Sequence, residues 1–263
     1  MMLRYLRIIL LSAVAGLPAA ASAAGSEAVT NFAQSATLNP AGELAITNEI
    51  DYDFGSAAAH DITFSLPLSY HDDQGREYHI KFTLTAAQQD GQAIDLKPSV
   101  TAASAQLVLP AGSNPTTARH YTVSYTLAPV VLRGRDADIL KLSVTGLGWA
   151  VPINRATLHL VTSVAPADNV TCFTGAQGST TGSCTVQQQG KTADVVSYAV
   201  LQPGESLSIF GDFPHNSFTS YLQSYEAHPR SLMGLIVTAL AGLAVGVALL
   251  VVFILYRRRR AGL

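Results

Sequence analysis

The chain has 263 residues, 16 of them basic and 18 acidic, with only two cysteines and a formal net charge of −2. Six of the basic residues are arginines near the two ends, so the segment between them carries a net charge of −8. Such an acidic segment excludes nucleic-acid binding through neutralisation of phosphates.

Residues 1–23 have the pattern of a secretory signal peptide. Arg4 and Arg7 precede an apolar stretch from Ile8 to Ala20, and a small-x-small pattern ends at Ala23. We expect cleavage after Ala23 or after the residue that follows it. An uncleaved N-terminal anchor is the alternative, which the short apolar stretch disfavours.

Residues 24–216 are expected to form one extracytoplasmic all-β domain. Between Glu43 and Phe54, apolar and polar residues alternate, as in a strand of an antiparallel sheet with one buried face. Similar alternation occurs in residues 61–68, 77–85, 119–127, 156–162 and 206–210. Short strands separated by turns predict an antiparallel β-sandwich of immunoglobulin-like or related Greek-key type. The immunoglobulin order Cys…Trp…Cys is missing, because Trp149 precedes both cysteines.

The two cysteines, Cys172 and Cys184, enclose a segment rich in glycine. An exported pair of this kind is most simply a structural disulfide. A zinc site would need about four ligands, and no histidine lies near in sequence. A redox pair usually has the tighter Cys-x-x-Cys spacing. Free thiols in a reducing compartment are the remaining alternative.

Several motifs together resemble a known bacterial membrane-protein family. They are Gly148 to Ile153, Cys172 to Ser179, the second cysteine Cys184, and Leu201 to Leu207, with Gly42 to Phe54 and Arg119 to Tyr125 upstream. In order and spacing, roughly residues 30–214 resemble the family catalogued as domain of unknown function 2207. The resemblance implies an extracytoplasmic β-domain tethered to the membrane, with no established activity.

The sequence contains neither a Gly-x-Ser-x-Gly elbow nor a His-Glu-x-x-His zinc helix. We therefore expect no catalytic residue, no metal site and no cofactor. The favoured interpretation is a non-enzymatic interaction or cell-envelope accessory module. Its candidate interface anchors are Tyr70, Tyr78, Arg133 and Arg135. The alternative is a hydrolase or transferase of envelope polymers, with a site built from distant loops.

The C-terminal part predicts a membrane anchor. After a short stalk, residues 217–231, the apolar run 232–256 is long enough to cross the bilayer as one helix. The basic tail, residues 257–263, contains the positive anchor Arg257, Arg258, Arg259 and Arg260. Positive charge beside a span stays in the cytoplasm, so we expect a single-pass protein of the bacterial cytoplasmic membrane with its N-terminal domain outside.

Small residues recur at every fourth position of the predicted membrane helix. They are Gly234, Thr238, Gly242 and Gly246. Such a stripe lets two helices approach closely and predicts a homodimer or packing against another membrane protein, with the lipid bilayer as the third partner. Alternatively, these glycines have no special role, since glycine is common in bilayer helices.

Overall fold

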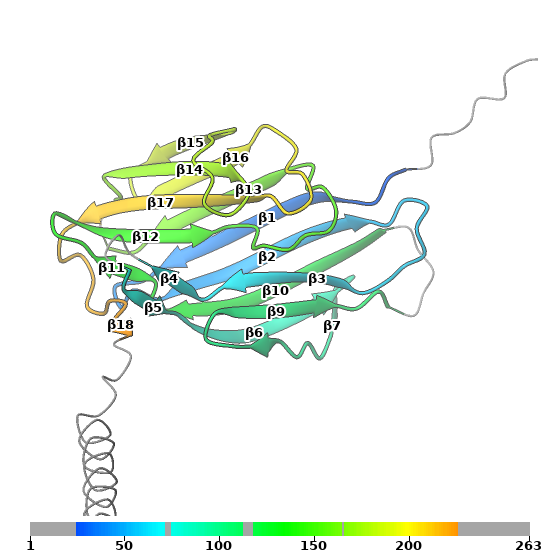
Figure 1. Cartoon of the computed structure of the whole chain (residues 1–263), viewed down its shortest axis with the longest axis horizontal. Helices are drawn as coiled ribbons and strands as arrows, with labels where there is room; N and C mark the ends of the chain where they lie inside the picture. The colour runs from blue at the N-terminus through cyan, green and yellow to red at the C-terminus, as the bar shows by residue number, and fades with distance from the viewer. Residues whose placement is uncertain (1–24, 72–74, 113–117, 165, 226–263) are drawn as a thin grey trace, which may run out of the picture.

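The computed structural model describes residues 25–71, 75–112, 118–164 and 166–225. Within these ranges the regular elements are all β-strands, arranged in four sheets (Figure 1). The all-β expectation is therefore confirmed.

The largest sheet has eight strands, and one of its faces is buried. Its order is β15 (Cys184–Gln189), β16 (Thr192–Ser197), β13 (Ala156–Thr162), β1 (Ala28–Leu38), β2 (Leu44–Asp53), β10 (Ala118–Ala128), β6 (Lys81–Gln89) and β7 (Gln92–Ala93). Along β2 and β10, buried residues alternate with more exposed ones, so one face of the sheet lies in the core.

Three smaller sheets complete the domain and lie over the large sheet in Figure 1. The four-stranded sheet has the order β11 (Val131–Arg133), β12 (Ala137–Ser143), β17 (Ser206–Pro214), β14 (Asn169–Gly175). One three-stranded sheet joins β18 (Ser224–Tyr225), β5 (Glu77–His79) and β4 (Ser69–His71). The other joins β3 (Ile62–Pro67), β9 (Ser104–Leu109) and β8 (Ser99–Val100).

The expectation of purely antiparallel pairing needs one correction. In the large sheet β1 pairs with β13 in parallel, from Phe32 opposite Ala156 to Leu38 opposite Thr162. A parallel pair cannot be closed by a tight hairpin, and here most of the folded domain lies between the two strands in sequence. The sheet is therefore mixed.

Trp149 connects the large sheet to β3. Its ring stacks on Phe64 of β3, with centroids 4.8 Å apart, and meets Phe32 of β1 edge-on at 6.0 Å. The indole N–H donates a 2.8 Å hydrogen bond to the carbonyl of Thr145, which satisfies the buried polar end of the ring. This side chain, 1% exposed, therefore fixes the spacing between the two elements.

The segment expected as a stalk begins inside the folded domain. Phe218, Tyr221 and Leu222 are buried, and the Leu222 amide donates to the Val131 carbonyl at 2.8 Å. The Thr219 amide also donates to the carbonyl of Pro40, in the turn between β1 and β2. Burial of three large apolar side chains stabilises the packing of this segment against the rest of the domain. The described part of residues 217–231 therefore belongs to the domain.

The other membrane predictions concern residues outside the described ranges. These are the signal peptide 1–23, the span 232–256 with Gly234, Thr238, Gly242 and Gly246, and the anchor Arg257 to Arg260. Within the part of the chain that the structure describes, no helix has the length and apolar character needed to cross a bilayer.

Candidate functional site

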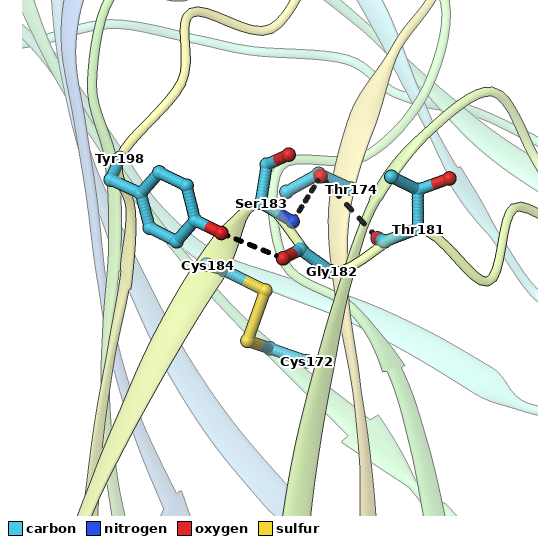
Figure 2. The surroundings of a disulfide bond; sticks show 7 residues. All are labelled: Cys172, Thr174, Thr181, Gly182, Ser183, Cys184 and Tyr198. Carbon is cyan, nitrogen blue, oxygen red and sulfur yellow. Dashed lines mark hydrogen bonds between the residues drawn. A yellow bond between two sulfur atoms is a disulfide. The ribbon is translucent and has the colours of Figure 1, made fainter.

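Cys172 and Cys184 form a disulfide, as predicted from the sequence. Cys172 lies in β14, an edge strand of the four-stranded sheet. Cys184 begins β15, an edge strand of the large sheet (Figure 2). The bond therefore joins the edges of two sheets and closes the intervening segment, residues 173–183, which we call the disulfide loop.

Hydrogen bonds hold the end of the disulfide loop in a defined conformation (Figure 2). The Thr174 amide donates to the Thr181 carbonyl at 2.7 Å, and the Ser183 amide donates to the Thr174 hydroxyl at 3.1 Å. From outside the loop, the Tyr198 hydroxyl donates to the Gly182 carbonyl at 2.9 Å. These hydrogen bonds give the disulfide loop a fixed conformation.

Glycine is required at one position of the disulfide loop. Gly175 has φ = 121°, a backbone conformation that L-residues with a side chain rarely adopt. A Cβ there would also lie 2.8 Å from the Ser179 hydroxyl oxygen. The sharp change of direction after β14 therefore depends on Gly175.

The disulfide loop borders a cavity of about 500 Å³, which we call the loop cavity. Residues 173–180 line one side of it, β12 and β17 contribute further lining residues, and Pro67, Ser69 and Tyr70 complete the rim. A second hollow of about 460 Å³ includes residues 174–179 as well as Val200 and Glu205. The loop therefore borders both hollows.

The cavity floor is the less buried face of three neighbouring strands. Five side chains from this face line it: Lys141 and Ser143 from β12, Ser208 and Phe210 from β17, and Phe173 from β14. They form a grid, because Lys141 is opposite Phe210 while Ser143 and Phe173 both flank Ser208. This brings together residues that lie up to 69 positions apart in sequence.

Two aromatic rings and one cation occupy the centre of the grid. Phe210, 41% exposed, meets Phe173 edge-on with centroids 5.5 Å apart. Lys141 Nζ lies 5.2 Å from the centroid of the Phe210 ring, within the range of a cation–π interaction. The cavity thus presents an apolar aromatic surface beside a positive charge.

Hydroxyl groups supply the remaining polarity. Ser143 Oγ is buried and has no hydrogen-bond partner among the described residues. Burial raises the pKa of Tyr70 on the rim to about 12, so its phenol stays neutral at physiological pH. The cavity lining contains no aspartate, glutamate, histidine or cysteine among the described residues. Its chemistry is that of a binding surface for an apolar group with a hydrogen-bonding or anionic end.

The histidine–carboxylate pairs found among the described residues lie elsewhere, and none of them borders the loop cavity. His120 Nδ1 is 2.7 Å from Asp51 Oδ1 across β10 and β2, and His159 pairs with Asp194 across β13 and β16 at 2.6 Å. The sequence did not indicate these pairs, because their partners come from different strands. Thr122 Oγ1 lies 3.4 Å from His120 Nε2, on the same face of β10. These histidines are about half exposed.

His60 is followed in sequence by Asp61, but its ion-pair partner is Glu27, 2.6 Å away. The Asp61 carbonyl, accepting a hydrogen bond from the ring, and the nearby Glu27 carboxylate raise the pKa of His60. No group of three or more potential metal ligands occurs within the described ranges.

A family model described as "Predicted membrane protein (DUF2207) N-terminal domain" matches residues 28–213. The chain belongs to the DUF2207 family. The matched range begins at the first residue of β1 and ends within β17, so it includes the disulfide and the floor of the loop cavity. This confirms the resemblance seen in the sequence motifs. The DUF2207 description gives a membrane-protein domain and names no activity.

No curated protein matches this DUF2207 sequence. Among solved structures, the chain resembles native leukotriene A4 hydrolase from Saccharomyces cerevisiae, with 7% identity and a TM-score of 0.46, over 71% of this chain and 29% of that one. It also resembles an M1 zinc metallopeptidase from Deinococcus radiodurans, with 11% identity and a TM-score of 0.36, over 70% of this chain and 42% of that one. The DUF2207 chain spans less than half of the length of either, and likeness at these scores carries no argument about activity.

Proposed function

We propose that this DUF2207 protein is a membrane-anchored interaction module. In the proposal, the loop cavity receives an apolar, preferably aromatic, group of a partner molecule that carries a negative charge at its end. The observation that carries this proposal is the pair formed by Lys141 and Phe210 on the cavity floor, with the cation 5.2 Å from the ring.

Three features of the cavity support such a ligand. The exposed Phe210 and its neighbour Phe173 offer a surface on which a flat apolar group gains contact area. Lys141 is the one charged side chain among the described residues that line the cavity, so it favours an anionic end over a cationic one. The unpartnered Ser143 hydroxyl can donate one hydrogen bond to that end.

The lining favours binding over catalysis. Hydrolysis or group transfer ordinarily uses a carboxylate, histidine or activated nucleophile positioned beside the substrate. The described lining residues of the loop cavity provide hydroxyls, aromatic rings and a lysine. We therefore place the protein's role in recognition, with the rigid wall of the disulfide loop setting the shape of the site.

The proposal includes a membrane topology. We propose that a signal peptide, residues 1–23, exports a β-sandwich beginning at residue 24, in which the eight-stranded sheet is one layer. We further propose that residues 232–256 cross the cytoplasmic membrane once and that Arg257 to Arg260 remain inside. Support comes from the positive charge beside the apolar run and from the family's description as a membrane protein. The stripe of Gly234, Thr238, Gly242 and Gly246 is proposed to pack against a second helix.

The binding proposal is tested with a pair of aromatic probes of opposite charge. The full chain in lipid nanodiscs is titrated with 2-naphthoate and, separately, with 2-naphthylmethylammonium, and binding is followed by saturation-transfer NMR against empty nanodiscs. The naphthoate should bind and the ammonium compound should not. Phe210→Ala should weaken naphthoate binding about tenfold, and Lys141→Met about fivefold.

Matched controls separate the cavity from general surface effects. Val108→Ala removes a similarly exposed apolar side chain, 42% exposed, from β9, and Lys97→Met removes a cation that does not line the loop cavity. Both controls should bind naphthoate like the unmodified chain. Equal binding of the two probes, or equal losses in the controls, would contradict the proposed site.

A further inference from the structure

A third hollow, separate from the loop cavity, lies where the described chain ends. It has a volume of about 240 Å³ and is bordered by residues of β5 and β11 and by residues next to β5 and β18. Figure 1 shows these three strands together at one end of the domain. We call this hollow the base pocket.

One side of the base pocket is an arginine held on a tyrosine ring. The Arg133 guanidinium carbon lies 4.0 Å from the centroid of the Tyr221 ring. The Tyr221 hydroxyl donates a 2.8 Å hydrogen bond to the fully buried carboxylate of Asp138, which fixes the ring in place. Among the described residues, Arg133 has no carboxylate within ion-pair distance, so its charge is available to a ligand.

The other side has a second arginine on a second tyrosine. Arg76 lies 5.9 Å from the centroid of Tyr78, and Tyr78 is the register partner of Ser224 in β18. The Gln223 side-chain amide also borders the hollow and donates to the Tyr221 carbonyl. No carboxylate is among the described residues that line the base pocket. The Arg133 guanidinium therefore faces a small hollow in an otherwise acidic domain, and Arg76, which has a further interaction of its own, lines the same hollow.

The base pocket is close in sequence to the predicted membrane span. Six residues separate Tyr225, the end of β18, from Leu232, the start of the apolar run. Fully extended, this connection reaches at most about 25 Å, and any other conformation brings the domain nearer. The interfacial layer, where lipid phosphates lie, is therefore within reach of the base pocket. Tyrosines are also enriched at that layer.

We propose that the base pocket binds the phosphate headgroup of an anionic phospholipid in the bilayer that anchors the protein. Guanidinium groups bind phosphate oxygens in a bidentate manner, so Arg133 on its rigid aromatic support is suited to the phosphodiester, with the cation of Arg76 beside it. Without such a contact, a domain of charge −8 is repelled by an anionic surface. This contact orients the domain on the membrane. The inference rests on the proposed membrane anchor and is independent of the loop cavity.

The test compares the full chain in nanodiscs of phosphatidylcholine alone with nanodiscs that also contain phosphatidylglycerol. The readout is hydrogen–deuterium exchange of the Leu222 amide, which donates to Val131 beside the base pocket. Phosphatidylglycerol should slow this exchange about fivefold, mainly through Arg133. In the double variant Arg76→Gln, Arg133→Gln the effect should vanish. Both arginines are exposed, so the double variant should still fold.

The double variant Lys97→Gln, Lys191→Gln changes the net charge equally at residues that do not line the base pocket, and it should behave like the unmodified chain. A separate arm adds inorganic phosphate to nanodiscs of phosphatidylcholine alone and should leave the exchange unchanged. Slowing by inorganic phosphate as strong as that by phosphatidylglycerol would replace the lipid with a soluble phosphate and overturn the proposal. Equal exchange in the two lipid compositions would also overturn it. Flotation of the nanodiscs with the protein distinguishes that result from a failed membrane anchor.

Discussion

Lys141 and Phe210 are direct neighbours across β12 and β17, and the ammonium group of the first lies over the ring of the second. The register of two antiparallel strands therefore creates a cationic aromatic surface at the floor of the loop cavity. The wall beside that surface is the disulfide loop, so the stability of the loop and the shape of the cavity are connected.

Removing the disulfide should destabilise the domain and weaken ligand binding in the loop cavity. The two cysteines are 12 positions apart, and closing a loop of that size contributes up to about 3 kcal/mol in the chain-entropy model. We expect the double variant Cys172→Ser, Cys184→Ser to lose about 2–3 kcal/mol in urea unfolding and to bind naphthoate less well. Unchanged unfolding under both reducing and oxidising conditions would show that the bond has no structural role.

Gly175 and Gly178 form a matched pair within the loop. Both have positive φ, 121° and 85°, but only at Gly175 would a Cβ meet another residue, 2.8 Å from Ser179 Oγ. We expect Gly175→Ala to cost about 2–3 kcal/mol of unfolding free energy and Gly178→Ala about 1 kcal/mol. The naphthoate affinity should fall mainly in the first variant. Equal effects of the two substitutions would mean that the wall is not packed as described.

The Tyr221 hydroxyl should matter more to stability than an exposed tyrosine hydroxyl. It donates to the buried Asp138 carboxylate, which also accepts a hydrogen bond from the Ser217 amide at 2.9 Å. Tyr221→Phe leaves that carboxylate short of one donor and should cost about 1–3 kcal/mol. Tyr198→Phe, at a side chain 68% exposed, should cost less than about 1 kcal/mol. Thermal and urea unfolding of the two variants would measure the difference.

His60 predicts a pH dependence of stability. Its pKa in the folded protein is raised above 6.5 by the Asp61 carbonyl and Glu27, so the folded state binds the proton more tightly than the unfolded state. The stabilisation is complete below pH 6.5 and is lost as the pH rises through the folded-state pKa. We expect His60→Gln to reduce the fall in melting temperature between about pH 6 and pH 8. A steeper fall in the variant would reverse the assigned sign.

His120 and Asp51 should be dispensable for binding. Their side chains are 45% and 44% exposed, and neither borders the loop cavity. We expect His120→Gln and Asp51→Asn to leave the naphthoate affinity unchanged, whereas an enzyme using the Thr122–His120–Asp51 chain would depend on both. Loss of the protein's cellular role in either variant, with folding and membrane level intact, would favour the enzymatic alternative.

The sequence predicts strands best where a buried face is purely apolar. The alternation in residues 43–54 predicts β2 almost to its ends. In β1, by contrast, the inward-facing residue Gln34 is polar, and its side-chain NH₂ donates to Asn48 Oδ1 and to the Val144 carbonyl. The second partner lies 110 residues away, so no local pattern reveals that Gln34 is buried. β1 and β13 are also far apart in sequence, so no local pattern reveals their parallel pairing.

The candidate site was only partly predictable. The disulfide follows from two cysteines in a segment that is expected to be exported. The floor of the cavity depends on the register of β12, β17 and β14, which no local sequence pattern reveals. Tyr70, Tyr78 and Arg133 were expected as interface anchors. The structure places Tyr70 at the loop cavity and the other two at the base pocket, while Arg135 lies in the exposed turn between β11 and β12.

The most direct test of the binding site is to locate the bound probe. Isotope-filtered NMR on the full chain in nanodiscs, with phenylalanine and lysine side chains labelled, would detect contacts between 2-naphthoate and individual residues. We predict contacts from the naphthalene ring to Phe210 and Phe173 and from its carboxylate end to Lys141. A probe that binds the protein but contacts none of these three residues would contradict the assignment of the loop cavity as the recognition site.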